Sequence, residues 1–149
     1  MPGLLIGRSL ANVPVQRSTV TITFTGAASL GAVGNLPLFT ITGQVIVLTV
    51  GGVVTTNLAG AGATLALGVT GSTSLFIGAT TATTMLTTAA LWVSTTPTAN
   101  GIALPAAVSG NGTLIETNLV GTVAVAAITS GVLRVDVWWA PWSANGALV

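Results

Sequence analysis

The stretch "VLRVDVWWAPW" (residues 132–142) carries the clearest fold signal in the chain. Its apolar and polar residues alternate with a period of two, which is typical of a β-strand with one face in the core. Pro141 ends the pattern because proline cannot donate to a strand ladder. One face is wholly apolar and the other carries the charges: Leu133, Val135, Val137 and Trp139 on the first, and Arg134, Asp136 and Trp138 on the second. We therefore predict a strand over 132–139 whose apolar face packs in the core.

Other short runs that are rich in β-branched and apolar residues recur along the chain. Glycine-rich or Asn-Gly connections separate the runs at intervals of about 8–12 residues, as in antiparallel sandwiches and barrels. We predict nine strands, at residues 19–25, 38–42, 44–50, 63–69, 73–80, 90–95, 113–118, 122–128 and 132–139. The run "TTATTMLTTAA" (80–90) is rich in threonine, so strand or loop is favoured there over a helical turn. The predicted fold class is all-β: an antiparallel two-sheet β-sandwich, jelly-roll-like, over residues 18–149.

The first 17 residues differ from the rest. "MPGLLIGRSLANVPVQR" (1–17) shows no clean alternation and holds two of the three arginines. We expect an extended N-terminal arm, and the apolar run at residues 4–6 favours docking of this arm on a neighbouring subunit. A floppy terminus is the alternative. Arg8 and Arg17 are candidate interface residues.

The chain is very poor in charge. Only 3% of its 149 residues are charged, and residues 18–115 contain no Asp, Glu, Lys or Arg. A folded chain of 14.6 kDa exposes roughly 6,900 Å². Five charges are few for a free surface of that size, because solubility depends on charge and on the absence of apolar patches. We therefore expect a subunit of an assembly.

Composition also argues against two classes of partner. The pI is about 9.3, but the net charge is only +1 and there is no lysine, whereas phosphate binding needs clustered cations. We therefore expect no nucleic acid partner. Thr, Ser, Asn or Gly interrupts every apolar run before the about 20 residues that a transmembrane helix needs, so we expect no membrane partner either.

Few side chains are suited to catalysis. The chain has no His, Cys, Tyr or Lys, which removes most general bases, nucleophiles and metal ligands. Glu116 and Asp136 are the only carboxylates, and an acid/base pair of the glycosidase type is one interpretation of them. The favoured interpretation is a structural ion cluster of Glu116, Arg134 and Asp136 across neighbouring strands. We expect no enzyme activity, no catalytic residues, no cofactor and no metal.

Three of the four tryptophans lie within residues 138–142. The alternation places Trp139 on the core face and Trp138 on the opposite face, while Trp142 follows Pro141 at the end of the strand. Because tryptophan is enriched at interface hot spots, we expect Trp138 and Trp142 to be presented to a neighbour. In the alternative interpretation all three rings cap the core.

Two long segments resemble a known class of proteins. "LPLFTITGQVIVLTVGGVVTTNLAGAGATLALGVTGSTSLFIGATTAT" (36–83) and "ITSGVLRVDVWWAPWSANGALV" (128–149) resemble small all-β accessory structural proteins of tailed bacteriophages, found on the surface of the head or tail. The similarity covers about residues 19–149. It rests on an "FT-T-G" strand turn, a Thr/Gly-rich stretch and a Trp, Pro and Ser that follow the last strand. It defines no catalytic residues.

The resemblance implies a capsid decoration, or cement, protein. Such a protein would form a homotrimer on the virion surface after synthesis in the host cytoplasm. Its partner would be the major capsid protein or another virion protein. We expect a virion structural protein that decorates and stabilises the capsid as a homo-oligomer. A tail fibre, spike or adhesion module of the virion is the alternative, and other self-assembling β proteins, including ice-binding proteins, stay open.

Overall fold

The computed structural model describes residues 14–96 and 112–149. Strands dominate these residues, and the described helix is one short turn. The elements in chain order are β1 (Gln16–Thr23), β2 (Gly34–Phe39), β3 (Ile41–Thr42), β4 (Val45–Ala59), β5 (Thr64–Val69), β6 (Ser72–Thr81), α1 (Ala82–Met85), β7 (Leu91–Trp92), β8 (Thr113–Ile115), β9 (Leu119–Ala124), β10 (Ser130–Pro141) and β11 (Ala147–Leu148). The prediction of an all-β fold is confirmed.

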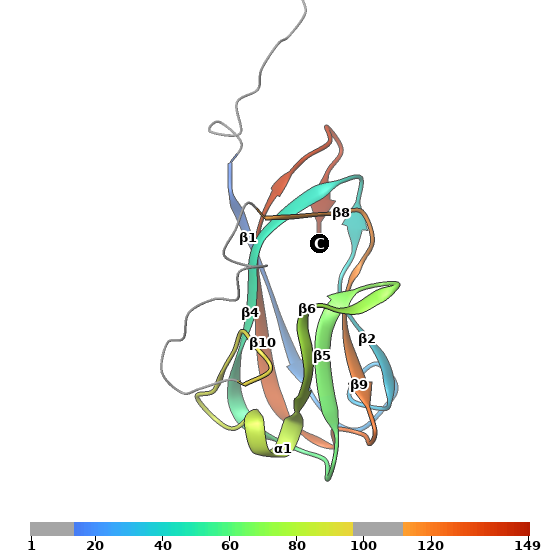
Figure 1. The fold of residues 1–149 in the computed structure, drawn as a ribbon, viewed down its shortest axis with the longest axis vertical. Helices are drawn as coiled ribbons and strands as arrows, with labels where there is room; N and C mark the ends of the chain where they lie inside the picture. Colours follow the sequence, from blue (N-terminus) through green and yellow to red (C-terminus); the bar gives the residue numbers. More distant parts are fainter. Residues whose placement is uncertain (1–13, 97–111) are drawn as a thin grey trace, which may run out of the picture.

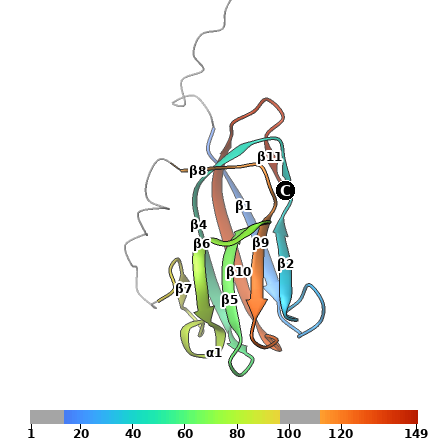
Figure 2. The same cartoon turned by 45° about the vertical axis from the view of Figure 1, so that its right-hand side comes forward.

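The strands form two larger antiparallel sheets and one small one. The first larger sheet has the order β1-β10-β4-β7, with β8 also pairing with β4. The second has the order β2-β9-β5-β6, and β11 pairs with β3 in a separate two-stranded sheet. Figures 1 and 2 show the two larger sheets as two layers, with β5, β6 and β9 on one side and β1, β4 and β10 on the other.

Strand β10 lies at the centre of the first sheet, between β1 and β4. The alternation that predicted it also sets its faces, because successive side chains of a strand point to opposite sides. Leu133, Val135 and Val137 are each at most 1% exposed and point into the space between the sheets. The prediction for this strand and for its core face is confirmed.

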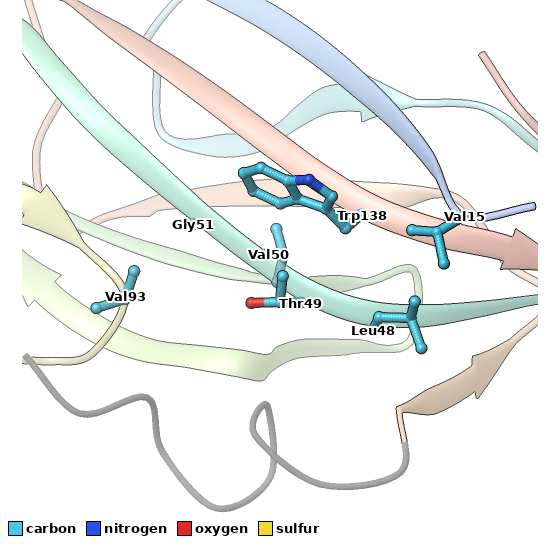
Figure 3. Close-up of a pocket in the computed structure, with 7 residues that line it drawn as sticks. All are labelled: Val15, Leu48, Thr49, Val50, Gly51, Val93 and Trp138. Atoms are coloured by element: carbon cyan, nitrogen blue, oxygen red, sulfur yellow. The ribbon is translucent and has the colours of Figure 1, made fainter.

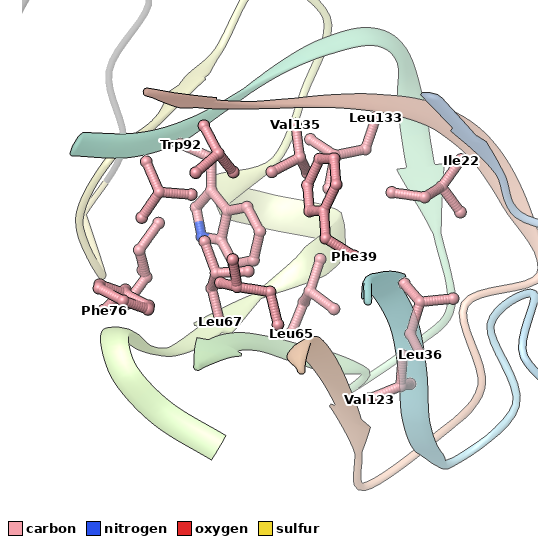
Figure 4. Packing of buried hydrophobic residues seen from close by; sticks show 14 of the residues in the cluster. Ile22, Leu36, Phe39, Leu65, Leu67, Phe76, Trp92, Val123, Leu133 and Val135 are labelled. Atoms are coloured by element: carbon pink, nitrogen blue, oxygen red, sulfur yellow. The ribbon is translucent and has the colours of Figure 1, made fainter. Parts of the chain in front are cut away.

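Both larger sheets contribute to a single core. Figure 4 shows side chains of the two layers meeting there, with Ile22, Leu133 and Val135 from the first sheet and Leu36, Leu65, Leu67 and Val123 from the second. Burying a side chain of this size contributes about 1.5–3 kcal/mol. With so few charges in the chain, this apolar burial is the main source of stability.

Strand β4 is longer than predicted. It continues past Val50 through Gly51 and Gly52 to Ala59. A glycine pair usually weakens a strand, but Gly52 allows close packing here. A Cβ on Gly52 would lie 3.0 Å from Leu133 Cδ1 and 3.3 Å from Trp92 Cε3. The missing side chain lets these two core residues approach the β4 backbone.

Other elements also depart from the predictions. β2 begins at Gly34 in a stretch that we expected to be a connection, and it contains Pro37, which an edge strand tolerates. The strands predicted at 90–95 and 113–118 are shorter, as β7 and β8. The predicted strand or loop at 82–85 is the helical turn α1 instead. Ala82 and Leu86, four residues apart, are both fully buried, and this packing outweighs the low helix propensity of threonine.

The arm boundary predicted after residue 17 was placed too late. β1 begins at Gln16, so Gln16 and Arg17 are part of the first sheet, opposite Trp139 and Trp138 of β10. Residues 1–13, which include Arg8, lie outside the described residues, and the prediction of an arm stays a prediction for them.

A buried hydrogen bond joins the two layers at Trp92. This ring is fully buried, and its Nε1–H donates to Thr80 Oγ1 at 3.0 Å. The Thr80 hydroxyl in turn donates to the carbonyl of Gly78 at 3.1 Å. Thr80 therefore satisfies the only polar group of the fully buried Trp92 side chain.

Replacing Thr80 by valine should destabilise the fold, because valine keeps the shape but leaves the Trp92 N–H without its acceptor. We expect the free energy of unfolding to fall by about 1–3 kcal/mol. Urea unfolding followed by tryptophan fluorescence measures this change. Thr80→Ser keeps the hydroxyl and is the control. Equal stabilities for the valine and serine variants would contradict the role given to the hydrogen bond.

Candidate functional site

The outer face of the first sheet carries a cluster of charges around Asp136. Asp136 belongs to the face of β10 that points away from the core, yet it is only 5% exposed. Its Oδ1 accepts hydrogen bonds from Arg17 Nη2 at 2.6 Å, Arg17 Nε at 3.1 Å and Thr19 Oγ1 at 2.6 Å. Its Oδ2 accepts one from Arg134 Nε at 3.0 Å. The side chains of its neighbours thus cover the carboxylate.

These hydrogen bonds determine the ionisation of Asp136. Burial by itself would raise the pKa of this carboxyl group, because burial penalises the charged form. The hydrogen bonds from Thr19, Arg17 and Arg134 outweigh that effect and hold the pKa below its ordinary value of 3.8. Asp136 is therefore ionised at neutral pH and balances one of the two arginines.

The predicted ion cluster is right for Arg134 and Asp136 but wrong for Glu116. The third member of the cluster is Arg17 of β1 and not Glu116. Glu116 follows β8, which pairs with the start of β4 at Val45, whereas Asp136 lies opposite Gly51. Val45 and Gly51 are six residues apart on β4, so the positions of Glu116 and Asp136 are about 20 Å apart along the strand. Glu116 is exposed, and its Oε2 accepts a hydrogen bond from Gln44 Nε2 at 3.3 Å.

The distance between Glu116 and Asp136 also tests the interpretation of these two carboxylates as an acid/base pair. Glycosidase carboxyl groups lie about 5–9.5 Å apart, far closer than these two levels of β4. The two carboxylates therefore do not form such a pair. Within residues 14–96 and 112–149, no three potential metal-ligating side chains of the His, Cys, Asp or Glu type gather into a group. In the same ranges no helix is long and apolar enough to cross a membrane.

Trp138 lies beside the Asp136 cluster on the outer face. It stands opposite Arg17 in the β1–β10 ladder, and the Arg17 Cζ is 5.3 Å from the centroid of the Trp138 ring. A guanidinium at this distance interacts favourably with the face of the indole. Arg17 therefore binds both Asp136 and Trp138 and holds the indole against the sheet.

The three C-terminal tryptophans divide as predicted between core and surface. Trp139 is 3% exposed, and its Nε1–H donates to Ser18 Oγ at 3.0 Å. Trp138 is 38% exposed and Trp142 is 53% exposed. The alternative in which all three rings cap the core is wrong. Whether a neighbour covers the two exposed rings stays a prediction.

An apolar groove runs along β4 beside Trp138, with a volume of about 490 Å³. Figure 3 shows Trp138 and Val15 along one side, Leu48 and Thr49 on β4 itself, and Val93 toward the far end. Thr49 supplies the hydroxyl among lining residues that are otherwise apolar or glycine: Val15, Leu48, Val50, Gly51, Val93 and Trp138. A Cβ on Gly51 would lie 2.7 Å from Val93 Cγ1, so this glycine lets Val93 lie against the strand.

One sign of this groove is visible in the sequence. The run "QVIVLTV" (44–50) is apolar on both faces, which suits a strand covered on both sides. One face packs in the core, and half-buried Leu48 lines the groove on the other. No sequence pattern indicated that Val15 and Val93 would complete it, because both come from other strands or connections.

Comparison of the chain with protein-family models, curated proteins and solved structures finds no match. Its function therefore has to be inferred from its own residues and their geometry.

The cluster predicts a specific dependence of stability on pH. The pKa of Asp136 is lowered in the folded state, so its stabilising effect is present above the pKa of the unfolded chain, near 3.9, and is lost as pH falls through the folded value. Asp136→Asn should lower the free energy of unfolding at pH 7 by about 1–3 kcal/mol. The variant should also lose less stability than the wild-type protein as pH falls below about 5, because it has no carboxylate at this position to protonate.

The matched control is Glu116→Gln, because it removes the other carboxylate, which is exposed. It should change stability at pH 7 by less than about 0.5 kcal/mol. Urea unfolding of the three proteins at pH 7 and pH 3 measures both effects. If Asp136→Asn and Glu116→Gln were equally stable at pH 7, the stabilising role of the cluster would be refuted.

Proposed function

We propose that this chain is a structural protein of a virion that decorates and stabilises the capsid surface as a homo-oligomer, most simply a trimer. The observation that carries the proposal is an outer surface that is nearly neutral and rich in apolar groups. Three of the four charged side chains in the described residues belong to the Asp136 cluster, and the fourth is Glu116. An isolated protein with such a surface would tend to associate.

Exposed apolar side chains support the same proposal. Besides Trp138 and Trp142, the described residues expose several large aliphatic side chains, which are Val15, Leu30, Val33, Leu75, Leu114, Val125 and Val149. Single exposed apolar residues are ordinary on protein surfaces, but an exposed Trp138 next to an apolar groove is not. Burial of such groups against other subunits would compensate for the missing charges.

The strand order supports the jelly-roll part of the proposal. Apart from the short strands β3, β8 and β11, eight strands remain, in the orders β1-β10-β4-β7 and β2-β9-β5-β6. These are the orders that arise when two Greek keys fold over one another as a two-sheet sandwich. Jelly rolls occur in viral capsid proteins but also in lectins and cupins. The fold is therefore compatible with the function and does not establish it.

The contacts of such a subunit would rest on apolar burial and neutral hydrogen bonds. Apolar burial contributes about 25 cal/mol per Å² and is not screened by salt. Three of the four charged side chains in the described residues are already engaged with one another, since Arg17 and Arg134 both bind Asp136. The major capsid protein, or another virion protein, would then present a complementary apolar surface. A location on the capsid after synthesis in the host cytoplasm belongs to the same proposal.

Sedimentation tests the proposal first. At micromolar concentration in analytical ultracentrifugation the full-length protein should sediment as a homo-oligomer, because a monomer would leave the neutral apolar surface in water. The measurement should be repeated in 1 M NaCl, where the Debye length is about 3 Å, and the oligomer should persist. A soluble monomer at these concentrations would contradict the proposal, and dissociation by salt alone would show that charges hold the contact.

Substitutions of the exposed Trp142 and of the buried Trp139 should have different effects on oligomerisation and stability. Trp142→Ala should shift sedimentation toward the monomer, with a change in unfolding free energy below about 0.5 kcal/mol, because the ring is on the surface. Trp139→Ala should instead cost about 3–5 kcal/mol of stability, because the ring fills the core. Sedimentation and urea unfolding of both variants measure this difference. An unchanged oligomer for Trp142→Ala would remove this ring from the interface.

Retention of the protein on assembled particles can be measured in the same way. Particles washed in 1 M NaCl should retain the wild-type protein and lose more of Trp142→Ala. Labelling of the retained protein by electron microscopy would also decide between capsid and tail. A label on the tail alone would replace the decoration role by that of a fibre or spike.

A further inference from the structure

The groove on β4 lies where the described part of the chain begins. Val15 lines one end of the groove, and residues 1–13 precede it outside the described part. A segment of 13 residues can reach about 43–47 Å when extended. Its sequence, "MPGLLIGRSLANV", is mostly apolar with a single charge at Arg8. Its chemistry therefore suits the apolar groove.

The strand register gives the direction in which this segment leaves the sheet. Gln16 stands level with Trp139 and Val47, and Arg17 stands level with Trp138 and Thr49. Because β1 and β4 both run antiparallel to β10, they are parallel to each other. Following β1 backward from Arg17 therefore leads toward Val45, whereas the groove extends the other way, toward Gly51.

This direction disfavours docking of the segment in the groove of its own chain. To enter that groove, the chain would have to reverse its course immediately before Val15. A segment that continues along its strand instead moves away from its own groove and becomes available to another copy. Exchange of identical segments between copies is a low-cost route to association of a chain with itself.

From these observations we infer that residues 1–13 of one copy bind in the β4 groove of a second copy, against Leu48, Val93 and Trp138. The inference deepens the proposed function and rests on it, since it requires a homo-oligomer. The apolar residues Leu4, Leu5 and Ile6 would fill the groove, and the Thr49 hydroxyl would offer a hydrogen bond to the incoming backbone.

Because the chain contains no cysteine, a pair of introduced cysteines reports on this contact without background. Two full-length proteins are prepared, Leu5→Cys in the N-terminal segment and Thr49→Cys in the groove, the second with a tag that changes its mass. The two are mixed under denaturing conditions, refolded together, oxidised and analysed by mass spectrometry. We expect a disulfide between position 5 of one chain and position 49 of the other.

Two controls and one alternative groove position complete the experiment. Ser72→Cys, on exposed residue 72 at the start of β6 in the other sheet, should form no disulfide with Leu5→Cys above background. Val93→Cys, at the other end of the groove, is a second groove position in case Thr49→Cys does not fold. Residues 1–13 can also be deleted from the Thr49→Cys protein. The disulfide between this shortened protein and the Leu5→Cys protein should still form, because the segment comes from the other copy.

Several results would overturn the inference. One is an oligomer by sedimentation that forms no disulfide between positions 5 and 49, which would leave the proposed function standing. Another is a disulfide that forms only within a chain carrying both cysteines, which would place the segment in its own groove. A third is an internal disulfide in a chain carrying Ile102→Cys and Thr49→Cys, with none to position 5, which would give the groove to residues 97–111. A monomer would overturn the inference together with the proposed function.

Discussion

Asp136 places a negative charge on the central strand β10, where the side chains around it exclude most of the solvent. A carboxylate in this position is tolerable only with donors around it, since an unpaired buried charge costs several kcal/mol. Arg17 and Thr19 supply those donors only when β1 pairs with β10 in the observed register, because a slip of one residue would turn both to the other face. The same register brings Arg17 onto Trp138 and Val15 to the groove, so the outer surface of the sheet depends on this one carboxylate.

The cluster also explains how so few charges leave a nearly neutral surface. Arg17 and Arg134 are bound to Asp136, and Glu116 lies about 20 Å away along β4. Next to the cluster the sheet presents an indole ring and an apolar groove. Charges that are already paired within the chain contribute little to solubility or to binding another protein. Apolar burial between subunits is the interaction that this surface can offer, and the proposed function follows from that.

The parts of the fold that the sequence predicted are those fixed by local alternation. β10 and the inward position of Trp139 follow from a period of two within a single run. The bonding of Asp136 to Arg134, two residues away on the same face, is local as well. Arg17 could not be predicted as the second partner, because it lies 119 residues away and meets Asp136 only through the pairing of β1 with β10. The length of β4 was missed for a related reason, since Gly52 serves packing by Leu133 and Trp92 rather than a turn.

Hydroxyl-radical footprinting read by mass spectrometry tests most directly the claim that this surface is buried between subunits. Oxidation of Trp138 and Trp142 is compared between the assembled protein and the protein dissociated to a folded monomer by dilution or mild detergent, with buried Trp92 as the internal reference. We expect oxidation of Trp138 and Trp142 to fall several-fold on assembly, while that of Trp92 stays low in both states. Equal oxidation of the two exposed rings in both states would contradict it.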